Sequence, residues 1–304
     1  MEGASPKVSI IIPHYNHVEC LKRLLPSIAN QTFHDYEVII IDDFTPDRSA
    51  PVYIRSLIKD YPKMRLVENN ENMGFIKTVN RGIGLSNAEY ICLLNQDTEV
   101  KESFVKKNVE ILDADASIAG LSCVIVDKYG KNWWTGGSLQ GGFPVNLRDD
   151  FEGIRRVDFV AGTAAFYSKE VFDKIGLFDE CYRMYHEDVE FGLRIRAKAD
   201  YKTCVFSHKL VVHHTVLSMP TPELDYYLAR NQILVVRTYF PQLLTRVIVK
   251  YLRDADIVRT LTKDILGLHP WLFFVHLLRF RPTFRGVFAG LRQKPSRRHR
   301  LVEE

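Results

Sequence analysis

The sequence predicts an α/β fold with a mostly parallel central sheet and helices on both faces. Short apolar runs alternate with amphipathic stretches through residues 8–112, an alternation typical of βαβ units. The runs are apolar throughout, which indicates strands buried on both faces. Three of them end in polar or acidic residues, and ligands of such sheets bind beyond the carboxyl ends of the strands.

The elements of this first half follow in order along the chain. Each expected strand is a continuous apolar run, and the first one is ended by Pro13. The strands lie at Val8–Ile12, Glu37–Ile41, Arg65–Val67 and Tyr90–Leu94, and the helices at Val18–Asn30, Val52–Asp60, Phe75–Leu85 and Lys101–Leu112.

The second half is less regular. Residues 129–150 are rich in glycine and aromatic residues, which favours a loop or a small β excursion. We expect a strand at Val157–Tyr167, a helix at Glu187–Ala199 and a strand at Thr203–His213. From Pro222 the chain becomes helical. There is no repeat or low-complexity linker, so one domain with a helical C-terminal extension is expected.

The net charge of +4 is unevenly distributed over the 304 residues. From residue 265 onward eight Lys/Arg face two acids, a net of +6, whereas the rest holds 33 basic and 35 acidic residues, a net of −2. The apolar stretch Leu266–Leu278 precedes all eight of these basic residues. This combination favours an amphipathic segment on an anionic membrane surface; the alternative is packing on the body with a solvated arginine face. Positive charge is the only feature that suggests nucleic-acid binding, so no nucleic-acid partner is expected.

The cysteines and the N-terminus suggest a location. The five cysteines form no C-x-x-C pair, which is typical of free thiols in a reducing compartment. Residues 1–7 are polar and lead into a strand, so no signal peptide is expected. No apolar run reaches the roughly 18–20 residues that span a bilayer. We therefore expect a cytoplasmic protein, peripheral at the inner face of the cell membrane.

Two acidic strand ends are candidates for ligand binding. Asn95-Gln96-Asp97 follows an apolar run, and a carboxylate there suits Mg²⁺ or Mn²⁺, which share oxygen ligands with substrate phosphates. Asp42-Asp43 ends the second run, where a carboxylate could accept a hydrogen bond from a nucleobase imide. Each motif is also compatible with an ordinary turn or helix N-cap.

Two further motifs lie in the second half. Glu187 and Asp188 open an expected helix, where the dipole favours an ionised carboxylate able to act as a general base. His213 and His214 follow a strand, and a neutral imidazole there could complete a metal shell begun by Asp97. Each motif also has an ordinary explanation. Acidic residues are enriched in the first turn of many helices, and a histidine pair at a strand end often has no functional role.

Three familiar signatures are missing from the chain. The absence of G-x-x-x-x-G-K-[ST] argues against a P-loop NTPase, and the absence of G-x-G-x-x-G after the first strand argues against a dinucleotide site. No G-x-S-x-G supports α/β-hydrolase chemistry.

The order of the motifs resembles glycosyltransferase family 2, which has the GT-A fold, and within it the rhamnosyltransferase-like branch. The resemblance covers roughly residues 7–240. It is carried by Val8–Asn16, Ile39–Asp43, Asn72–Phe75 with Asn80 and Arg81, Leu93–Glu99, Phe159–Thr163, Gly176–Asp179 leading into His186–Asp188, Arg194, Val212–His213 and Arg230–Asn231.

The resemblance implies a nucleotide-sugar transferase domain at residues 1–240 and a helical, basic extension at 241–304. The donor would be a nucleotide-diphosphate sugar, and the acceptor a saccharide or lipid-linked saccharide in cell-surface glycan synthesis. The residues assigned to donor binding are Pro13, Tyr15, Asp42, Asp43, Asn72, Gly74, Arg81, Asn95, Gln96 and Arg194. Either Asp42 or Asp43 would hold the nucleobase.

The resemblance also assigns the metal and the base. Asp97 occupies the D-x-D position and would hold Mg²⁺ or Mn²⁺, with His213, or else His214, as a further ligand. Asp188 would be the base for an inverting transfer, with Glu187 and Arg194 positioning the site or the acceptor. Asn95 replaces the first Asp of D-x-D, which favours dTDP-rhamnose over a UDP-hexose.

Two other classes remain as alternatives. A sugar-phosphate nucleotidylyltransferase would need a Gly-rich, basic phosphate loop after the first strand, where this chain has Pro13-His14-Tyr15-Asn16. A non-catalytic nucleotide-sugar-binding protein is suggested by Asn95 alone.

Overall fold

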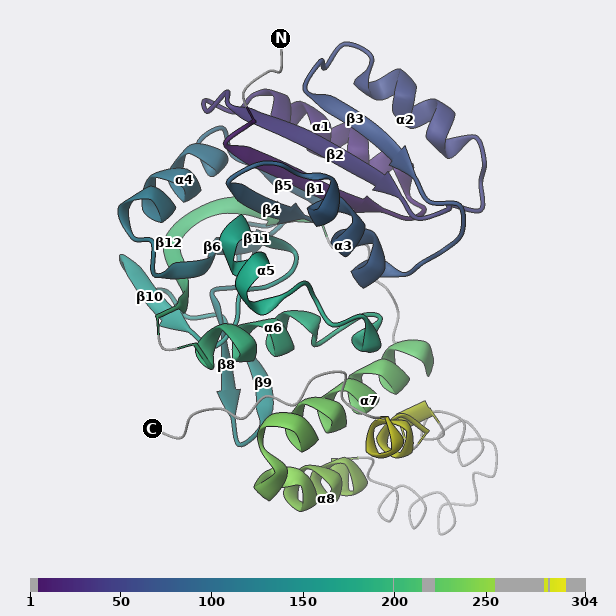
Figure 1. The fold of residues 1–304 in the computed structure, drawn as a ribbon, viewed down its shortest axis with the longest axis vertical. Helices are drawn as coiled ribbons and strands as arrows, with labels where there is room; N and C mark the ends of the chain where they lie inside the picture. Colours follow the sequence, from purple (N-terminus) through teal and green to yellow (C-terminus); the bar gives the residue numbers. More distant parts are fainter. Residues whose placement is uncertain (1–4, 199, 215–221, 255–281, 284, 294–304) are drawn as a thin grey trace. The chain divides into compact units, whose positions relative to one another are not determined.

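The fold was examined in a computed structural model, which describes residues 5–198, 200–214, 222–254, 282–283 and 285–293 (Figure 1). Clustering of the chain gives two compact units. The first contains residues 1–138, 145–183 and 187–216, and the second contains 139–144, 184–186 and 217–304. The domain boundary expected at residue 240 stays a prediction.

The first unit is built around a ten-stranded sheet with the order β10-β12-β6-β11-β4-β1-β2-β3, to which β5 and β7 add by pairing with β12 and β6. The strands are β1 (Val8–His14), β2 (Tyr36–Asp42), β3 (Met64–Glu68), β4 (Tyr90–Leu94), β5 (Thr98–Val100), β6 (Ile118–Asp127), β7 (Asn132–Trp134), β10 (Ile154–Val157), β11 (Ala164–Ser168) and β12 (Lys202–His213). A separate two-stranded sheet joins β8 (Gly136–Gln140) and β9 (Phe143–Leu147).

The helices of this unit connect the strands (Figure 1). They are η1 (Val18–Cys20), α1 (Leu21–Ala29), α2 (Ala50–Ile58), α3 (Phe75–Leu85), α4 (Phe104–Ala114), α5 (Lys169–Ile175), η2 (Glu180–Tyr182) and α6 (Glu187–Arg196). The expected α/β fold is confirmed, with the predicted strands and helices of residues 8–112 present and their ends shifted by a few residues.

The pairing explains why the core strands are apolar throughout. β3, β2, β1 and β4 run parallel, as do β6 and β12, whereas β11 runs antiparallel to both β4 and β6. Along β1 and β2, successive residues point to opposite faces, yet Ile10, Ile11 and Ile12 are all fully buried. Both faces of the sheet are therefore covered at its centre.

A glycine sets the distance between α3 and the sheet. A Cβ added at Gly82 would lie 2.5 Å from Cγ2 of Ile11 and 2.8 Å from Cδ1 of Ile41. Both isoleucines are fully buried in adjacent parallel strands. No side chain fits at this position, so α3 packs directly against β1 and β2.

Two expectations for the second half are corrected by the structure. The strand expected at Val157–Tyr167 is two strands, since β10 ends at Val157 and β11 begins at Ala164, and they lie at different places in the sheet. Residues 158–163 form the connection between them. The sequence analysis also missed β6, whose Gly120 leaves room for Tyr167 and Thr203: a Cβ there would lie 3.2 and 3.1 Å from these side chains. Gly120 interrupts the apolar run of β6 because the side chains of Tyr167 and Thr203 approach its backbone closely.

The described part of the second unit is mainly helical. It contains α7 (Pro222–Tyr239), η3 (Pro241–Leu243), α8 (Leu244–Asp254) and a helical stretch at residues 285–292. Its core holds Ala229, Ile233, Val236, Val247 and Val287, surrounded by Phe143, Phe240, Leu243, Leu244, Ile248, Tyr251 and Leu291. The helical extension expected from Pro222 onward is present. Among the described helices, none is long and apolar enough to cross a membrane. The Leu266–Leu278 stretch lies outside the described residues.

A strained turn at residues 184–186, in the second unit, is held by side chains of helix α7. Tyr185 and His186 have φ of 62° and 65°, left-handed values that bulky residues rarely adopt. The buried Asn231 amide donates to the carbonyls of Met184 and Tyr185, at 2.7 and 2.8 Å. Burial lowers the pKa of His186 to about 4, and the neutral ring bonds Gln232 at 3.1 Å. These contacts offset the cost of the backbone conformation.

Candidate active site

The carboxyl ends of β3, β2, β1 and β4 are joined by a row of hydrogen bonds. The backbone N–H of Asp43 donates to the carbonyl of His14 at 2.8 Å, and that of Asn69 donates to Asp42 at 2.8 Å. Tyr15 and Gln96 exchange two bonds, from the Tyr15 N–H to Oε1 at 3.3 Å and from Nε2 to the Tyr15 carbonyl at 3.1 Å. The predicted site residues of these four strand ends therefore lie along one edge.

Asp42 is fully buried between His14 and Thr45. Its carboxylate bonds Nδ1 of His14 at 2.9 Å and accepts from the hydroxyl and backbone N–H of Thr45 at 2.6 and 3.2 Å. Burial acts to raise the pKa of Asp42, but these hydrogen bonds outweigh it and lower the pKa. Asp42 is therefore ionised at neutral pH and fixes the turn after β2.

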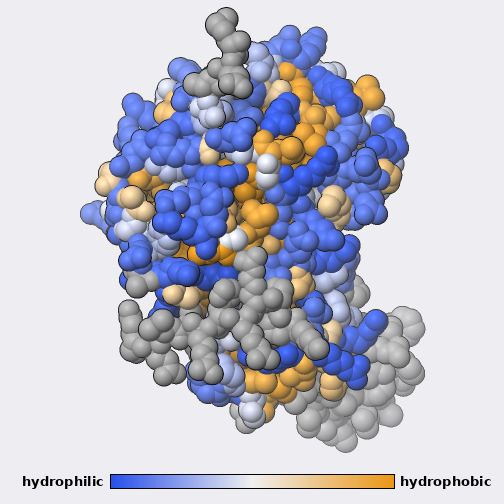
Figure 2. All heavy atoms as spheres, viewed as in Figure 1, coloured by the Kyte–Doolittle hydropathy of each residue, from blue (hydrophilic) through white to orange (hydrophobic). Residues whose placement is uncertain are grey.

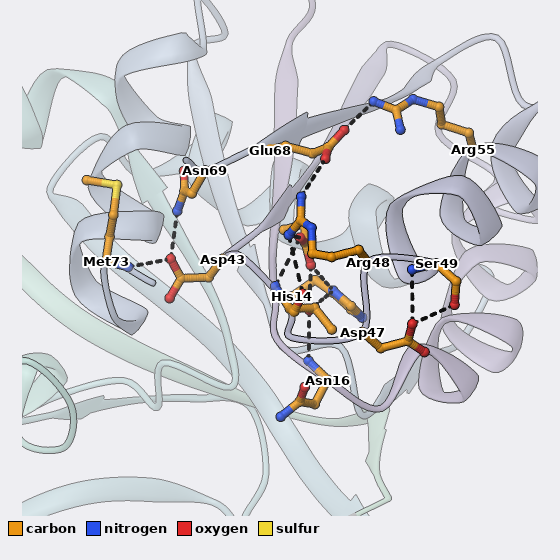
Figure 3. A network of polar contacts seen from close by, with 12 residues as sticks. His14, Asn16, Asp43, Asp47, Arg48, Ser49, Arg55, Glu68, Asn69 and Met73 are labelled. Atoms are coloured by element: carbon orange, nitrogen blue, oxygen red, sulfur yellow. Dashed lines mark hydrogen bonds and ion pairs between the residues drawn. The ribbon is translucent and has the colours of Figure 1, made fainter. Parts of the chain in front are cut away.

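Asp43, the next residue, contacts the segment that connects β3 to α3. Its Oδ1 accepts from Asn69 at 2.7 Å and from the backbone N–H of Met73 at 2.8 Å (Figure 3). Its Oδ2 accepts from the N–H of Gly74 at 2.9 Å. Gly74 has φ of 84° and directly precedes α3. The Asp43 carboxylate thus positions the start of α3. Asn72, which precedes Met73 in the chain, is exposed.

Arg81 reaches this edge from α3. Its guanidinium donates to the carbonyl of Glu68 at 2.8 Å and to the side chain of Asn69. Asn69 therefore touches both Asp43 and Arg81. The sequence analysis did not select Asn69, although its position directly after β3 was a signal of the same kind as the other strand ends.

A carboxylate and an imidazole converge between β4 and β12. Oδ2 of Asp97 lies 3.2 Å from Nε2 of His213, and the backbone N–H of His214 donates to the carbonyl of Asp97 at 2.8 Å. The His214 ring instead contacts Glu99, at 3.0 Å. Burial acts to raise the pKa of Asp97, but the hydrogen bond and charge of His213 outweigh it and lower the pKa. The structure therefore pairs Asp97 with His213.

The Asp97–His213 pair is chemically suited to a divalent cation. It offers one carboxylate oxygen and one ring nitrogen pointing at each other. Within the described ranges no three His, Cys, Asp or Glu side chains gather to form a complete metal shell. Mg²⁺ and related ions in phosphate-handling sites take one or two carboxylates and complete their shell with substrate phosphates and water. A pair of protein ligands fits that use.

Glu187 and Asp188 open α6 and lie against the connection between β10 and β11. Oδ2 of Asp188 accepts from the N–H of Gly162 at 3.3 Å, and Oδ1 accepts from the N–H of Val189 at 2.8 Å. Asp188 is half-buried, whereas Glu187 is 9% exposed and its Oε2 has no partner among the described residues. Backbone donors thus favour the carboxylate form at Asp188.

Burial raises the pKa of both carboxyl groups. For Glu187, burial is the largest cause and the charge of Asp188 adds to it, bringing the pKa to about 8. For Asp188, burial also raises the pKa, and the N–H groups of Gly162 and Val189 oppose it. Two adjacent carboxyl groups of this kind titrate as a pair. The backbone N–H groups that bind Asp188 favour Asp188 over Glu187 as the member of the pair that carries the negative charge.

The connection between β10 and β11 links this carboxylate to the end of β4. Thr163, directly after Gly162, accepts a hydrogen bond at its carbonyl from the N–H of Asn95, at 2.9 Å. Two consecutive residues of one loop therefore hold Asp188 on one side and the end of β4 on the other. The sequence analysis placed Gly162 and Thr163 inside a strand, so it could not foresee this bridge.

Arg194 lies in a different environment from the one expected. It is 1% exposed, and its guanidinium donates to the carbonyls of Ile175, Gly176 and Leu177 at 2.9, 3.2 and 2.9 Å. It also pairs with Glu190 at 2.9 Å. With its donors used in this way, Arg194 supports the chain after α5. Pro13 is half-buried at the end of β1, and Tyr15 is 41% exposed beside it.

Comparison with known proteins identifies the class. The sequence pattern of glycosyl transferase family 2 matches residues 9–176, more than half of the chain. In the solved structure of GalNAc-T7 with UDP, GalNAc and Mn²⁺, the similarity covers 79% of this chain and 50% of that one, with a TM-score of 0.63 and 17% identity. The fold is therefore that of the GT-A glycosyltransferases. The chain belongs to glycosyl transferase family 2.

Two curated relatives are informative. A glycosyltransferase of Haemophilus influenzae is 29% identical over 126 residues, 40% of this chain and 39% of that protein. The GalNAc(5)-diNAcBac-PP-undecaprenol beta-1,3-glucosyltransferase of Campylobacter jejuni is 32% identical over 96 residues, 31% of each chain. This chain thus matches about a third to two fifths of the length of these relatives.

Proposed function

We propose that this protein is an inverting glycosyltransferase that uses Mg²⁺ or Mn²⁺. It transfers a sugar from a nucleoside-diphosphate sugar, either a UDP-hexose or dTDP-rhamnose, to a hydroxyl of a saccharide acceptor. The observation that carries the proposal is the bridge made by Gly162 and Thr163. It ties the carboxylate of Asp188 to the strand end that carries Asp97, so a base and a cation site belong to one constellation.

Donor binding is assigned to the edge formed by β1, β2, β3 and α3. One of the carboxylates of Asp42 and Asp43 accepts a hydrogen bond from the nucleobase, with Arg81 close to Asp43 through Asn69. Tyr15, held against Gln96 and 41% exposed, is available to pack on the base. The diphosphate then extends toward Asp97 and His213.

A bound cation would neutralise the charge that develops on the diphosphate leaving group. Asp97 and His213 are the protein groups that hold it. His214 is directed to Glu99, which favours His213 as the ligand of the two histidines. Asn95 contributes its backbone, not a second carboxylate, to this edge.

Asp188 acts as the general base. It takes the proton of the acceptor hydroxyl while that oxygen bonds to the anomeric carbon. The bond from this carbon to the diphosphate oxygen breaks, and its electron pair leaves with the nucleoside diphosphate. A single displacement of this kind inverts the anomeric configuration. The N–H groups of Gly162 and Val189 fix the orientation of the Asp188 carboxylate, and Glu187 stays protonated beside it.

The acceptor and location are proposed from the relatives and the sequence. The name of the Campylobacter jejuni relative describes transfer to a saccharide on undecaprenol diphosphate. A lipid-linked saccharide at the inner face of the cell membrane agrees with the basic tail, whose net charge is +6. We extend the proposal accordingly to cell-surface glycan synthesis by a cytoplasmic, peripheral enzyme.

The direct test is product release. The protein is incubated with UDP-glucose, UDP-GlcNAc or dTDP-rhamnose, with Mg²⁺ or Mn²⁺ and a saccharide acceptor. Release of nucleoside diphosphate together with a β-linked product from an α-linked donor, or the converse, supports inverting transfer. Release of pyrophosphate from nucleoside triphosphate and sugar phosphate would instead identify a nucleotidylyltransferase. Donor binding without turnover would leave a non-catalytic binding protein.

A further inference from the structure

Trp133 lies at a β-bulge next to the proposed cation site. In the antiparallel pairing of β6 and β7, Ile125 is opposite Trp134 and Val126 is opposite Asn132. Trp133 is therefore the extra residue of the bulged strand. A bulge bends its strand and changes the direction of a side chain, and bulges are frequent beside active sites.

The bulge brings Trp133 into contact with His213. The two ring centroids are 4.3 Å apart and the ring planes meet at 61°, an edge-to-face geometry that aromatic pairs favour. His213 is two strands away, because β12 pairs with β6 and His213 is opposite Asp127. The indole thus passes over the end of β6 to reach the imidazole.

Core packing does not account for this contact. Trp134, the next residue, is 1% exposed and fills the interior, whereas Trp133 is only half-buried. The ring that Trp133 contacts belongs to a polar pair, since Nε2 of His213 lies 3.2 Å from Oδ2 of Asp97. A large apolar surface has been placed against a polar ring.

We propose that Trp133 is a positioning residue that fixes the imidazole of His213 with Nε2 directed at Asp97 for a divalent cation. The inference rests on the proposed function. The χ2 torsion of a histidine is broad, so the ring orientation needs an external support. The indole supplies a wall on one side of the ring, and it also excludes water from the imidazole, as apolar groups around metal ligands do.

The test compares three variants by metal affinity. Free Mn²⁺ is measured by electron paramagnetic resonance during titration of the protein with UDP present. Loss of groups that orient metal ligands typically weakens binding about 10–100-fold. Trp133→Ala is expected to weaken Mn²⁺ affinity about tenfold, and Trp133→Phe, which keeps an aromatic ring, is expected to restore most of it. The control Tyr129→Ala removes an 83% exposed ring from the same segment and is expected to leave affinity unchanged.

A second readout distinguishes positioning from folding. Trp133→Ala should raise the Mn²⁺ concentration for half-maximal rate, while the rate at saturating Mn²⁺ stays near that of the wild type. Wild-type Mn²⁺ affinity in Trp133→Ala would overturn the inference, as would equal weakening in Tyr129→Ala. If the wild type itself shows no metal-dependent binding of UDP, the cation role in the proposed function fails instead.

Discussion

Nδ1 of His14 and Oδ1 of Asp42 lie 2.9 Å apart, and neither side chain is exposed to solvent. The two residues are directly opposite each other in the parallel pairing of β1 and β2. A buried carboxylate is stable only when it has hydrogen-bond donors, and Thr45 supplies the other ones. This contact closes the edge of the sheet where the nucleobase is proposed to bind.

His14→Ala should lower the free energy of unfolding by about 1–3 kcal/mol, because it leaves the buried carboxylate of Asp42 short of a partner. Urea denaturation followed by circular dichroism measures the change. His34→Ala, at an exposed position, should stay within about 0.5 kcal/mol of the wild type. Equal stability of the two variants would show that the His14–Asp42 contact contributes nothing.

Asp188→Asn should reduce the rate of transfer by a factor of about 10²–10⁴, the usual contribution of a general base. The amide cannot take the acceptor proton, and its single oxygen can keep only one of the two backbone bonds, because these bonds go to different oxygens of the carboxylate. Nucleoside diphosphate release gives the rate, and calorimetry gives donor affinity, which should be nearly unchanged. Asp173→Asn, on the exposed side of α5, is the matched control. Substantial activity in Asp188→Asn together with weak donor binding would refute the assignment of the base.

Glu187 should make the stability of the protein depend on pH. Burial raises its pKa from 4.5 to about 8, so the folded state binds more protons than the unfolded state between these values. Stability must therefore fall as the pH rises through this window. In Glu187→Gln that loss should disappear, and the melting temperature at pH 8.5 should exceed that of the wild type by a few degrees. Parallel melting curves for both proteins from pH 5 to 8.5 would contradict the assignment.

Asp97→Ala should abolish the dependence of nucleoside diphosphate binding on metal. In the wild type, removal of Mg²⁺ or Mn²⁺ with EDTA should weaken UDP binding about tenfold or more, because a cation held by Asp97 would neutralise the charge of the diphosphate. Calorimetric titrations with and without EDTA provide both affinities. Asp60→Ala, which removes an exposed carboxylate at the end of α2, should behave as the wild type. An unchanged metal effect in Asp97→Ala would remove Asp97 from the site.

The triple variant Arg297→Gln, Arg298→Gln, Arg300→Gln should weaken binding to anionic vesicles. Each basic residue near such a surface contributes about 1 kcal/mol to binding. The affinity for phosphatidylserine vesicles, measured by cosedimentation, should therefore fall about 100-fold. Deleting the whole tail is a poorer experiment, because residues 285–292 pack on α7 through Gly286 and Gly290. Replacement of the same arginines by lysine should retain binding. An unaltered partition of the glutamine variant would exclude the tail as a membrane anchor.

The sequence predicted the parts of the fold that depend on local pattern. Strands such as β1 and β4 are uninterrupted apolar runs buried on both faces, and their polar ends marked the edge of the site. β6 was missed because Gly120 and Ser122 break the run, and the reason for small residues there lies in Tyr167 and Thr203 on neighbouring strands. No reading of one strand can supply that information.

In the candidate site, too, the features that depend on contacts between distant segments could not be predicted from the sequence. The pairing of Asp97 with His213, rather than with His214, depends on the register between β5 and β12, which the sequence does not encode locally. Arg194 was expected at the site because of its motif, but its donors are used by three consecutive carbonyls after α5. The bulge at Trp133 arises from a shift between two strands, so a one-dimensional pattern could not indicate it.

The bare backbone of Gly82 also bears on how donor preference could be redesigned. With methyl groups of Ile11 and Ile41 occupying the space of a Cβ, α3 has no freedom to shift against the sheet, and Arg81 beside it is held at a constant height over β3. Libraries that place a larger residue at position 82 would therefore consist mostly of misfolded proteins. Lys77, which is exposed, and Gly84, where an added Cβ meets nothing within 4 Å, offer variation on the same helix without that penalty, so redesign of α3 should begin at those two positions.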